Sequence, residues 1–472
     1  MTRTIKVANP RTGDFDYEIA AASRDEIEAV AKGSRGSQAD WFASGQAARC
    51  EAMLRLAQCL EDESRCIMRA LETDTGRRRL AGAEIMGVIA NIRAWAGLVP
   101  NLMPESGWVQ GRSKPNFKHM QGYVPYGLVG IISPWNFPMT LSFIDAVPAL
   151  LAGGCVMIKP SEVTPRFADA LVPVIRNAGF DHVLAFIQGD GETGANLIDC
   201  VDCVCFTGSV PTGRKVAVRA AENLIPANLE LGGKDPLIIA DGANMDAATT
   251  LALRSSVLAT GQACQSIERV YVPRPMYAEF TGMLAEKAKA VKLDWPDIDQ
   301  GHIGPFIFGK QAGIVDAQIR DAVAKGAKIL TGGKILNHGG GKWLEPTVLT
   351  GVNHDMDIMR LETFGPVMPV MAYDRIEEAV QLANDTEYGL SAGVFAASIH
   401  EAREIGQHIE AGAISLMDAA LTGQYFEADK QSFKNSGLGP SRMGRNGFLR
   451  FFRQKAYIAN TVAPLTLEDF QE

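Results

Sequence analysis

The chain has 472 residues, of which 47% are hydrophobic and 21% charged, and its formal net charge is −8 at pH 7. A chain of this length is longer than those that usually fold around a single hydrophobic core, so we expect two or three domains. The acidic balance argues against a nucleic-acid-binding protein, which normally carries a basic excess. No run approaches 18 apolar residues, and the first six residues lack the apolar core of a secretory signal, so we expect a cytoplasmic protein.

The first 126 residues divide into a helical part and an extended part. Residues 15–110 have a mostly helical pattern, in which Ser23 and Glu26 have the spacing of a capping box. From Trp108 to Tyr126 the sequence is polar and extended, with glycines at positions 107, 111 and 122. We therefore expect helices that cover one face of a sheet, followed by an extended insertion.

Short apolar runs alternate with helical stretches from residue 127 onwards. The strands expected in the first such unit are 127–132, 155–159, 183–187, 201–206, 229–231 and 236–240, and its helices are a stretch ending at 151, then 168–177 and 213–223. A second unit is expected to have helices 244–259 and 276–291, a strand at 267–272, and strands near residues 328 and 367. This alternation predicts an α/β fold with parallel sheets and a Rossmann-like first half.

The eight cysteines show no disulfide-scaffold spacing, so reduced thiols are expected. Cys200, Cys203 and Cys205 are close enough in sequence to suggest zinc. No second CxxC and no histidine pair stands in register with them, so no metal is expected. Their apolar neighbours lead directly into Phe206, which favours a buried strand.

A glycine turn follows that strand, although the chain has no GxGxxG. Residues 208–213 (GSVPTG) lie between a predicted strand and a predicted helix. Glycine lets the backbone approach a ligand closely, and the amino end of a helix offers free N–H groups to a pyrophosphate. Glycine turns at strand ends are also common without any ligand, so this signal is weak by itself.

Cys264, in the segment GQAC, and Glu230, in the segment ELGGK, suggest covalent catalysis. A thiolate attacks carbonyl carbon readily, and a carboxylate can activate the water that releases the resulting acyl group. A single cysteine is more often a small buried hydrophobic residue. The neighbouring motifs favour the catalytic interpretation.

Seven motifs occur in the order typical of one family. They are PWNFP (134–138), KPSE (159–162), FTGS (206–209), ELGGK (230–234), GQAC (261–264), EPT (345–347) and ETFGP (362–366). Through them the chain resembles the aldehyde dehydrogenase superfamily, from about residue 8 to residue 444. The resemblance implies a non-acylating, NAD(P)-dependent aldehyde dehydrogenase.

The resemblance also implies a domain organisation. Residues 1–106 and 127–235 would form the NAD(P)-binding domain, and residues 236–454 the catalytic domain. Residues 107–126 and 455–472 would form a small β oligomerisation domain, in which the insertion is a protruding hairpin and its partner strand lies at about 455–464. We accordingly expect a homodimer or homotetramer, with a small-molecule aldehyde as substrate and neither nucleic acid nor membrane as partner.

The family match assigns roles to the three candidate catalytic residues. Cys264 would attack the aldehyde, and its backbone N–H together with the Asn136 side chain would hold the oxyanion. Glu230 would activate water against the thioester. Without the family match, Asn136 could equally be a turn residue of the PWNFP segment.

The match further implies a cofactor site. The expected contacts are Ser133, Pro134, Trp135, Lys159, Ser161, Glu162, Gly208, Ser209, Thr212, Leu231, Gly232, Glu362 and Phe364. Glu162 would accept hydrogen bonds from the adenosine ribose, which favours NAD over NADP.

Two positions depart from the family pattern near the substrate. Asp145 stands where many relatives have lysine, and Met417 where they usually have asparagine. The segment 436–442 keeps its glycines but lacks the usual basic-acidic pair. The expected pocket residues Phe137, Ile144, Met417 and Phe433 are apolar, which favours an aromatic or medium-chain aldehyde.

Two alternatives remain at this stage. A coenzyme A-acylating enzyme would resolve the acyl group with a thiol, but that branch typically lacks the base that Glu230 supplies. A catalytically inactive structural homologue would not need Cys264, Glu230 and Asn136 together.

Overall fold

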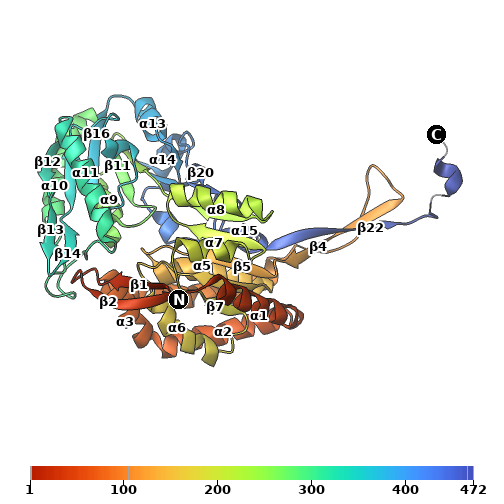
Figure 1. Ribbon diagram of the computed structural model, residues 1–472. Coiled ribbons are helices and arrows are strands. Elements are labelled where there is room, and N and C mark those ends of the chain that lie inside the picture. Colours follow the sequence, from red (N-terminus) through yellow and green to blue (C-terminus); the bar gives the residue numbers. More distant parts are fainter. Residues whose placement is uncertain (1–2, 105, 465, 471–472) are drawn as a thin grey trace.

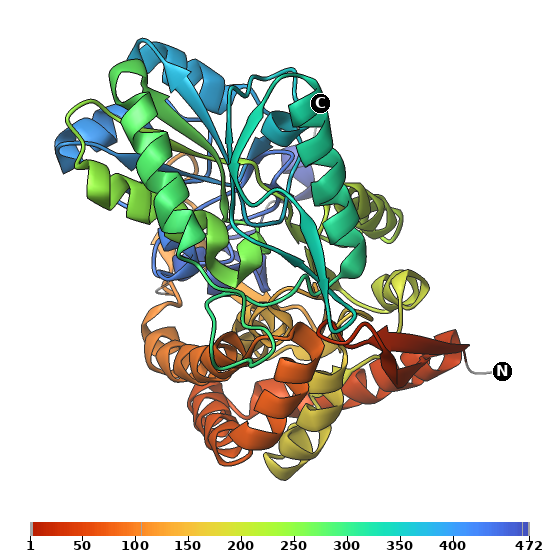
Figure 2. The same cartoon turned by 90° about the vertical axis from the view of Figure 1, so that its left-hand side faces the viewer.

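The computed structural model describes residues 3–104, 106–464 and 466–470. It has two α/β lobes and a long arm that projects from them (Figure 1). Figure 2, turned by 90°, shows the red-to-yellow part of the chain mainly in one lobe and the green-to-light-blue part in the other. The predicted α/β class is confirmed. Among the described residues, no helix has the length and apolar character needed to cross a membrane.

The first lobe is built on a six-stranded sheet with the order β21-β9-β8-β5-β6-β7. Its strands are β5 (Leu128–Ile132), β6 (Cys155–Lys159), β7 (Leu184–Phe186), β8 (Cys203–Thr207), β9 (Ala227–Glu230) and β21 (Gly437–Leu438). The five strands β5 to β9 are parallel to their neighbours, as predicted, and β21 is antiparallel to β9. The helices around it are α1 (Arg24–Ala43), α2 (Gln46–Asp62), α3 (Ser64–Thr75), α4 (Arg78–Leu98), α5 (Pro138–Ala152), α6 (Arg166–Asn177), α7 (Gly191–Ile198), α8 (Val210–Glu222) and α15 (Gly444–Leu449).

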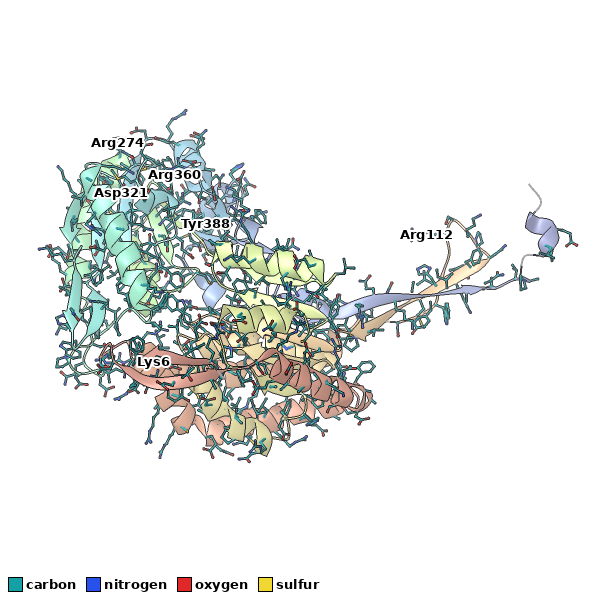
Figure 3. The ribbon with its side chains drawn as sticks, in the orientation of Figure 1. Lys6, Arg112, Arg274, Asp321, Arg360 and Tyr388 are labelled. Carbon is teal, nitrogen blue, oxygen red and sulfur yellow. The ribbon has the colours of Figure 1, made fainter. Side chains whose placement is uncertain are left out.

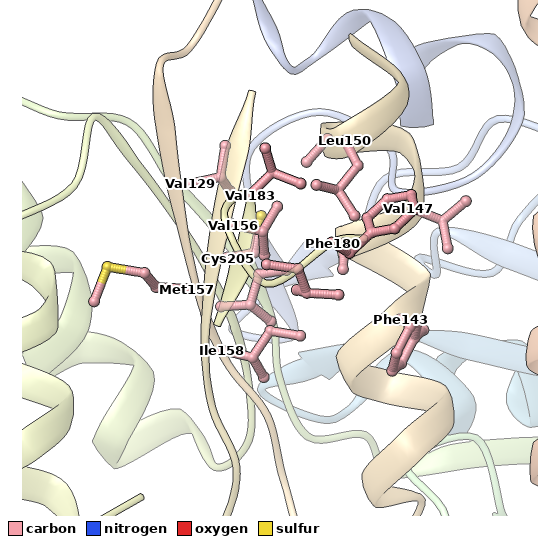
Figure 4. Packing of buried hydrophobic residues seen from close by; sticks show 14 of the residues in the cluster. Val129, Phe143, Val147, Leu150, Val156, Met157, Ile158, Phe180, Val183 and Cys205 are labelled. Atoms are coloured by element: carbon pink, nitrogen blue, oxygen red, sulfur yellow. The ribbon is translucent and has the colours of Figure 1, made fainter. Parts of the chain in front are cut away.

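Buried side chains of this sheet pack against α5. Figure 4 shows Val129 and Ile158 of the sheet beside Phe143, Val147 and Leu150 of the helix, and all of them belong to one hydrophobic cluster. On β8, Cys203 and Cys205 are fully buried in the same cluster, so the predicted core strand is confirmed. No group of histidine, cysteine or acidic side chains in the described part of the chain could hold a metal ion.

The helical prediction for residues 15–110 is wrong at its start. Phe15–Ala21 is a strand, β2, which pairs antiparallel with β1 (Arg3–Ala8). Its last three residues alternate between buried and exposed, the period-two pattern of a half-buried strand. The capping box is confirmed, because Glu26 N donates to Ser23 Oγ and Ser23 N donates to Glu26 Oε2.

The second lobe contains a seven-stranded sheet with the order β12-β15-β16-β11-β10-β18-β19. Its strands are β10 (Asp235–Ile239), β11 (Ile267–Pro273), β12 (Lys328–Thr331), β15 (Thr347–Thr350), β16 (Val367–Tyr373), β18 (Ser391–Phe395) and β19 (Ala413–Leu416). The helices are α9 (Met245–Val257), α10 (Arg274–Lys289), α11 (Gly309–Ala324), α12 (Asp357–Arg360), α13 (Ile376–Asn384) and α14 (Ile399–Gly406). The strands predicted at 267–272 and near 328 and 367 are present, as are both predicted helices.

The arm is a three-stranded antiparallel sheet of β3 (Val109–Gln110), β4 (Phe117–Pro125) and β22 (Phe452–Asn460). β22 pairs with β4 along its whole length, from Phe452 opposite Pro125 to Asn460 opposite Phe117. Figure 3 shows Arg112 on the arm, far from both lobes. The predicted pairing of the insertion with the C-terminal strand is confirmed, and that strand begins three residues earlier than expected.

We propose the division into residues 1–106 with 127–235, residues 236–454, and residues 107–126 with 455–472 as the domain organisation. The two large sheets and the arm support it. Within 236–454, β21 joins the first sheet and α15 packs against α5, so this late stretch lies with the first lobe.

Candidate active site

The loop that carries Cys264 is fixed by close backbone contacts. It follows α9 and the short helix η2 (Leu258–Gly261), where Ala259, Thr260 and Gly261 all have positive φ. A Cβ atom on Gly261 would lie 2.3 Å from the carbonyl group of Gly365, so only glycine fits there. The strained turn at Ala259, Thr260 and Gly261 therefore fixes the start of the short segment that leads to the thiol.

Gln262 connects this loop to Asn136. Its side chain donates to Pro305 O at 3.2 Å and accepts from Ile307 N at 2.9 Å, and its carbonyl accepts from Asn136 Nδ2 at 3.0 Å. The backbone carbonyl of Asn136 in turn accepts from Arg77. The Asn136 amide is thus buried and oriented, as a preorganised hydrogen-bond donor must be.

Glu230 ends β9, and Gly233, three residues later, passes close to the Cys264 loop. A Cβ atom on Gly233 would lie 2.7 Å from the Cys264 carbonyl oxygen. Glu230, Cys264 and Asn136 line one cavity, which also has Leu80, Phe137, Leu141, Ile144, Leu258 and Phe426 in its wall. We call it the apolar cavity. The structure thus brings the three predicted catalytic residues together.

The Cys264 thiol lies in an electrostatically mixed environment. Burial raises its pKa to about 12, the ammonium of Lys430 acts in the opposite direction, and Glu230, Asp235 and Glu362 raise it further. The resting thiol is therefore protonated at neutral pH, and reaction requires a proton acceptor.

All thirteen predicted cofactor contacts line two adjoining cavities on the other side of Cys264. The outer cavity contains Ser133, Lys159, Ser161, Glu162 and Thr212. The inner cavity contains Leu231, Gly232, Glu362, Phe364, Asn136 and Cys264. Pro134, Trp135, Gly208 and Ser209 line both.

The outer cavity combines a charged pair with the amino end of α8. Lys159 Nζ lies 2.8 Å from Glu162 Oε2. Ser209, the residue before the helix, contacts Thr212 Oγ1 at 3.2 Å and makes no side-chain hydrogen bond to the helix backbone. The first-turn N–H groups of α8 therefore suit an anionic group such as a pyrophosphate.

The inner cavity is shaped by Glu362 and Phe364. A Cβ atom on Gly232 would lie 2.7 Å from both carboxylate oxygens of Glu362, so glycine is needed there. The Phe364 ring lies 5.3 Å from the Trp135 ring in a T-shaped arrangement. Its backbone N–H donates to Glu268, which is buried and paired with Lys234 of the ELGGK segment.

Two of the four predicted substrate-pocket residues line the apolar cavity. Phe137 and Ile144 line the apolar cavity, whereas Met417 and Phe433 are not among the described residues that do. Met417 follows β19 and packs against the core of the second lobe. Phe433 lies on β20 (Phe433–Lys434), pairs with Gly389 of β17 (Tyr388–Gly389), and is 47% exposed. Lys430, three residues earlier, lines the cavity instead.

Asp145, which stands where many relatives have lysine, forms ion pairs with two arginines. Asp145 accepts hydrogen bonds from Arg442 and Arg450, and all three side chains are buried. Although burial acts to raise it, the pKa of Asp145 is below its ordinary value because of these two guanidinium groups. Arg442 also donates to Thr207 Oγ1 at 2.8 Å, at the end of β8. The sequence did not predict a role for these residues: Arg442 ends the segment 436–442, but its pairing with Asp145 was not expected, and no motif marks Arg450 or Lys430.

The comparisons with known proteins agree with this arrangement. The model of the aldehyde dehydrogenase family matches residues 1–457. A Mycobacterium ulcerans protein named "Putative succinate-semialdehyde dehydrogenase (NADP(+)) 2" is 36% identical over 92% of this chain and 83% of its own length. A betaine aldehyde dehydrogenase of Rhizobium leguminosarum is 34% identical over 86% of this chain and 84% of its own.

Solved structures are similar over nearly the full length. The structure described as "Putative Aldehyde Dehydrogenase PutA" from Anabaena variabilis has a TM-score of 0.96 and 47% identity, and covers 99% of this chain and 100% of that one. Lactaldehyde dehydrogenase from Escherichia coli has a TM-score of 0.91 and 28% identity, and covers 97% and 96%. The chain therefore belongs to the aldehyde dehydrogenase family of oxidoreductases.

Proposed function

We propose that the chain oxidises an aldehyde to the carboxylic acid through a covalent intermediate on Cys264. One observation carries this proposal: Cys264 and Asn136 line both the inner cavity and the apolar cavity, while Glu230 lines the apolar cavity alone. A substrate carbonyl in the apolar cavity would thus meet the thiol and the amide together. Glu230 would face the same carbonyl from the wall of the apolar cavity.

The chemical roles follow from the side chains. The Cys264 thiol gives its proton to solvent water, and the thiolate attacks the aldehyde carbon. Asn136 Nδ2 and the Cys264 N–H stabilise the oxyanion, and one such donor is worth on the order of 3 kcal/mol. A bound nicotinamide dinucleotide supplies the hydride acceptor. Glu230 then takes a proton from the water that attacks the thioester on Cys264, which releases the acid.

The inner and outer cavities fit that dinucleotide. Lys159 and Glu162 would hold the adenosine ribose, and Gly208, Ser209 and Thr212 would meet the pyrophosphate at the amino end of α8. Glu362 would hold the second ribose, beside the space that Gly232 leaves open. Phe364 would pack beside the nicotinamide, with Trp135 and Leu231 in the wall.

An aromatic or medium-chain aldehyde fits the apolar wall best. Three cations, Arg254, Lys430 and Arg442, also line the cavity, but each is already paired with a carboxylate, that of Asp418, Glu230 and Asp145 respectively. NAD reduction measured across aliphatic, aromatic and charged aldehydes tests this assignment. Higher kcat/KM for carboxylate-bearing semialdehydes would instead favour the substrate class named for the mycobacterial relative.

We expect the enzyme to prefer NAD to NADP because of Glu162. A 2′-phosphate would bring negative charge against this carboxylate, which is 39% exposed and paired with Lys159. The pairing and the solvent reduce the repulsion, so we expect a discrimination of roughly 1–3 kcal/mol, about ten- to a hundredfold in kcat/KM. Glu162→Thr should raise the relative use of NADP.

The measurement is kcat/KM for both cofactors in the wild type and in the variant. Equal use of NAD and NADP by the wild type contradicts the prediction, as does an unchanged ratio in Glu162→Thr. Two features favour NADP in that event: Lys215 lines the same cavity, and the mycobacterial relative is named for NADP(+).

We expect the protein to be a homodimer or homotetramer assembled through the arm. Val109, Tyr457 and Ile458 expose 56%, 42% and 72% of their surfaces there. Exposed apolar side chains on a projecting sheet with free edges usually mark an interface. Light scattering should give a mass two or four times the 50.8 kDa of one chain.

A matched variant sharpens this measurement. Ile458→Asp places a charge on the exposed side of the arm and should shift the mass toward 50.8 kDa without unfolding either lobe. A wild-type monomer at micromolar concentration would rule the assembly out.

A further inference from the structure

We propose that Lys430 is a positioning residue of this active site, whose ammonium group holds the Glu230 carboxylate and stabilises the Cys264 thiolate. The inference rests on the proposed roles of those two residues. Lys430 belongs to none of the seven motifs, and it lines the apolar cavity with both partners.

Contacts on Glu230 give the first support. Lys430 Nζ lies 3.5 Å from Glu230 Oε2, and Ser432 Oγ donates to the same oxygen at 3.1 Å. Neither group engages Oε1. The carboxylate is therefore held through one oxygen, and the other stays available to accept a proton from water.

The backbone around Lys430 is anchored from two sides. Its N–H donates to Ser441 Oγ at 3.0 Å, and the neighbouring Asp429 Oδ1 accepts from Asn446 N at 3.0 Å. The Lys430 side chain is only 5% exposed. A long flexible side chain that is anchored and enclosed in this way presents its charge at a defined place.

The charges around the thiol give the second support. Burial disfavours the thiolate most, and Glu230, Asp235 and Glu362 also disfavour it, whereas the ammonium group of Lys430 favours it. Arg442 also acts on Glu230, but its guanidinium group is engaged by Asp145 and Thr207. Loss of Lys430 would leave the thiolate facing carboxylates.

A purely structural ion pair is the competing explanation. Burying an ammonium without a partner is costly, so Lys430 and Glu230 could serve only to neutralise each other. That role predicts an effect of substitution on folding and none on the ionisation of Cys264. The reactivity of the thiol therefore separates the two explanations.

The experiment measures alkylation of Cys264 by iodoacetamide, a neutral reagent, across neutral to alkaline pH. Lys430→Met should move the rate profile to higher pH and slow alkylation at neutral pH about tenfold, which corresponds to one pH unit. Lys430→Arg keeps the charge and should retain most of the wild-type rate. Glu230→Gln removes a negative charge and should move the profile the other way.

The matched control is Lys434→Met. Lys434 lies on β20 and pairs with Glu410, outside the described wall of the apolar cavity, so its loss should leave the profile unchanged. Circular dichroism and dinucleotide binding show whether each variant is folded. A folded Lys430→Met protein with the wild-type alkylation profile overturns the proposal.

This measurement needs neither aldehyde nor cofactor, so it separates failure of the inference from failure of the proposed function. Mass spectrometry identifies the alkylated residue. If Cys264 is not the alkylated residue in the wild type, the nucleophile assignment fails together with the inference. If it is, and Lys430→Met keeps the wild-type profile while Glu230→Gln shifts it, the role of Lys430 alone is wrong.

Discussion

Replacement of Cys264 by alanine is expected to abolish turnover, lowering kcat by at least about a thousandfold. Among the described residues that line the inner and apolar cavities, only Cys264 carries a thiol, so its loss removes the covalent route. The change removes one atom at a junction of two cavities, and dinucleotide binding should remain nearly intact. Steady-state NAD reduction measures the first effect, and quenching of tryptophan fluorescence, with Trp135 in the cavity wall, measures the second.

Cys66→Ala is the matched control for this prediction. Cys66 is an exposed free cysteine on α3, so its loss should change neither quantity. Residual activity of more than about a few per cent in Cys264→Ala would show that the nucleophile is wrongly assigned.

The core strands could be predicted from sequence because burial on both faces leaves a simple pattern. Cys155–Lys159 and Asp235–Ile239 are short apolar runs bounded by glycine or turns, and both are fully buried. Elements with a weaker sequence pattern were missed. α11 begins with glycine, has a second glycine in its second turn, and was not predicted, and β19 has only four residues.

The candidate site was predictable where its residues occur in contiguous motifs. Cys264, Glu230 and Asn136 come from three such segments, and close glycine contacts bring the segments together. Glu230 and Lys430 are 200 positions apart, and Asp145 and Arg442 are 297 apart. Ion pairs at such separations leave no local signal, so they required the structure.

The predicted pocket residue Phe433 illustrates the same limit. Phe433 is expected among the apolar pocket residues, but the two-residue pairing of β20 with β17 holds it at an exposed edge. The irregular segment before that strand brings Lys430 to the cavity instead. Lys430 and Phe433 are only three residues apart, and the segment has no helical or strand periodicity. The pattern of apolar residues therefore could not show which of the two side chains lines the cavity.

Glu230→Gln is expected to give one rapid burst of NADH per active site, followed by a slow phase at least about a hundredfold below the wild-type rate. The amide keeps the shape of the carboxylate but cannot take a proton from water. Oxidation on Cys264 should therefore proceed once, and the thioester should accumulate. Lys430 loses its partner in this variant, which favours the thiolate and leaves the first step intact.

Rapid mixing with absorbance detection measures the burst, and mass spectrometry of acid-quenched samples should find the acyl group on Cys264. Glu279→Gln is the matched control, because Glu279 lies exposed on α10 in the second lobe. Loss of the burst itself would mean that Glu230 acts before oxidation, as the acceptor of the Cys264 proton. A base for the thiol would matter to the first step, because burial raises the pKa of Cys264 to about 12 and keeps the resting thiol protonated. The burst amplitude therefore decides whether Glu230 serves the water, the thiol, or both.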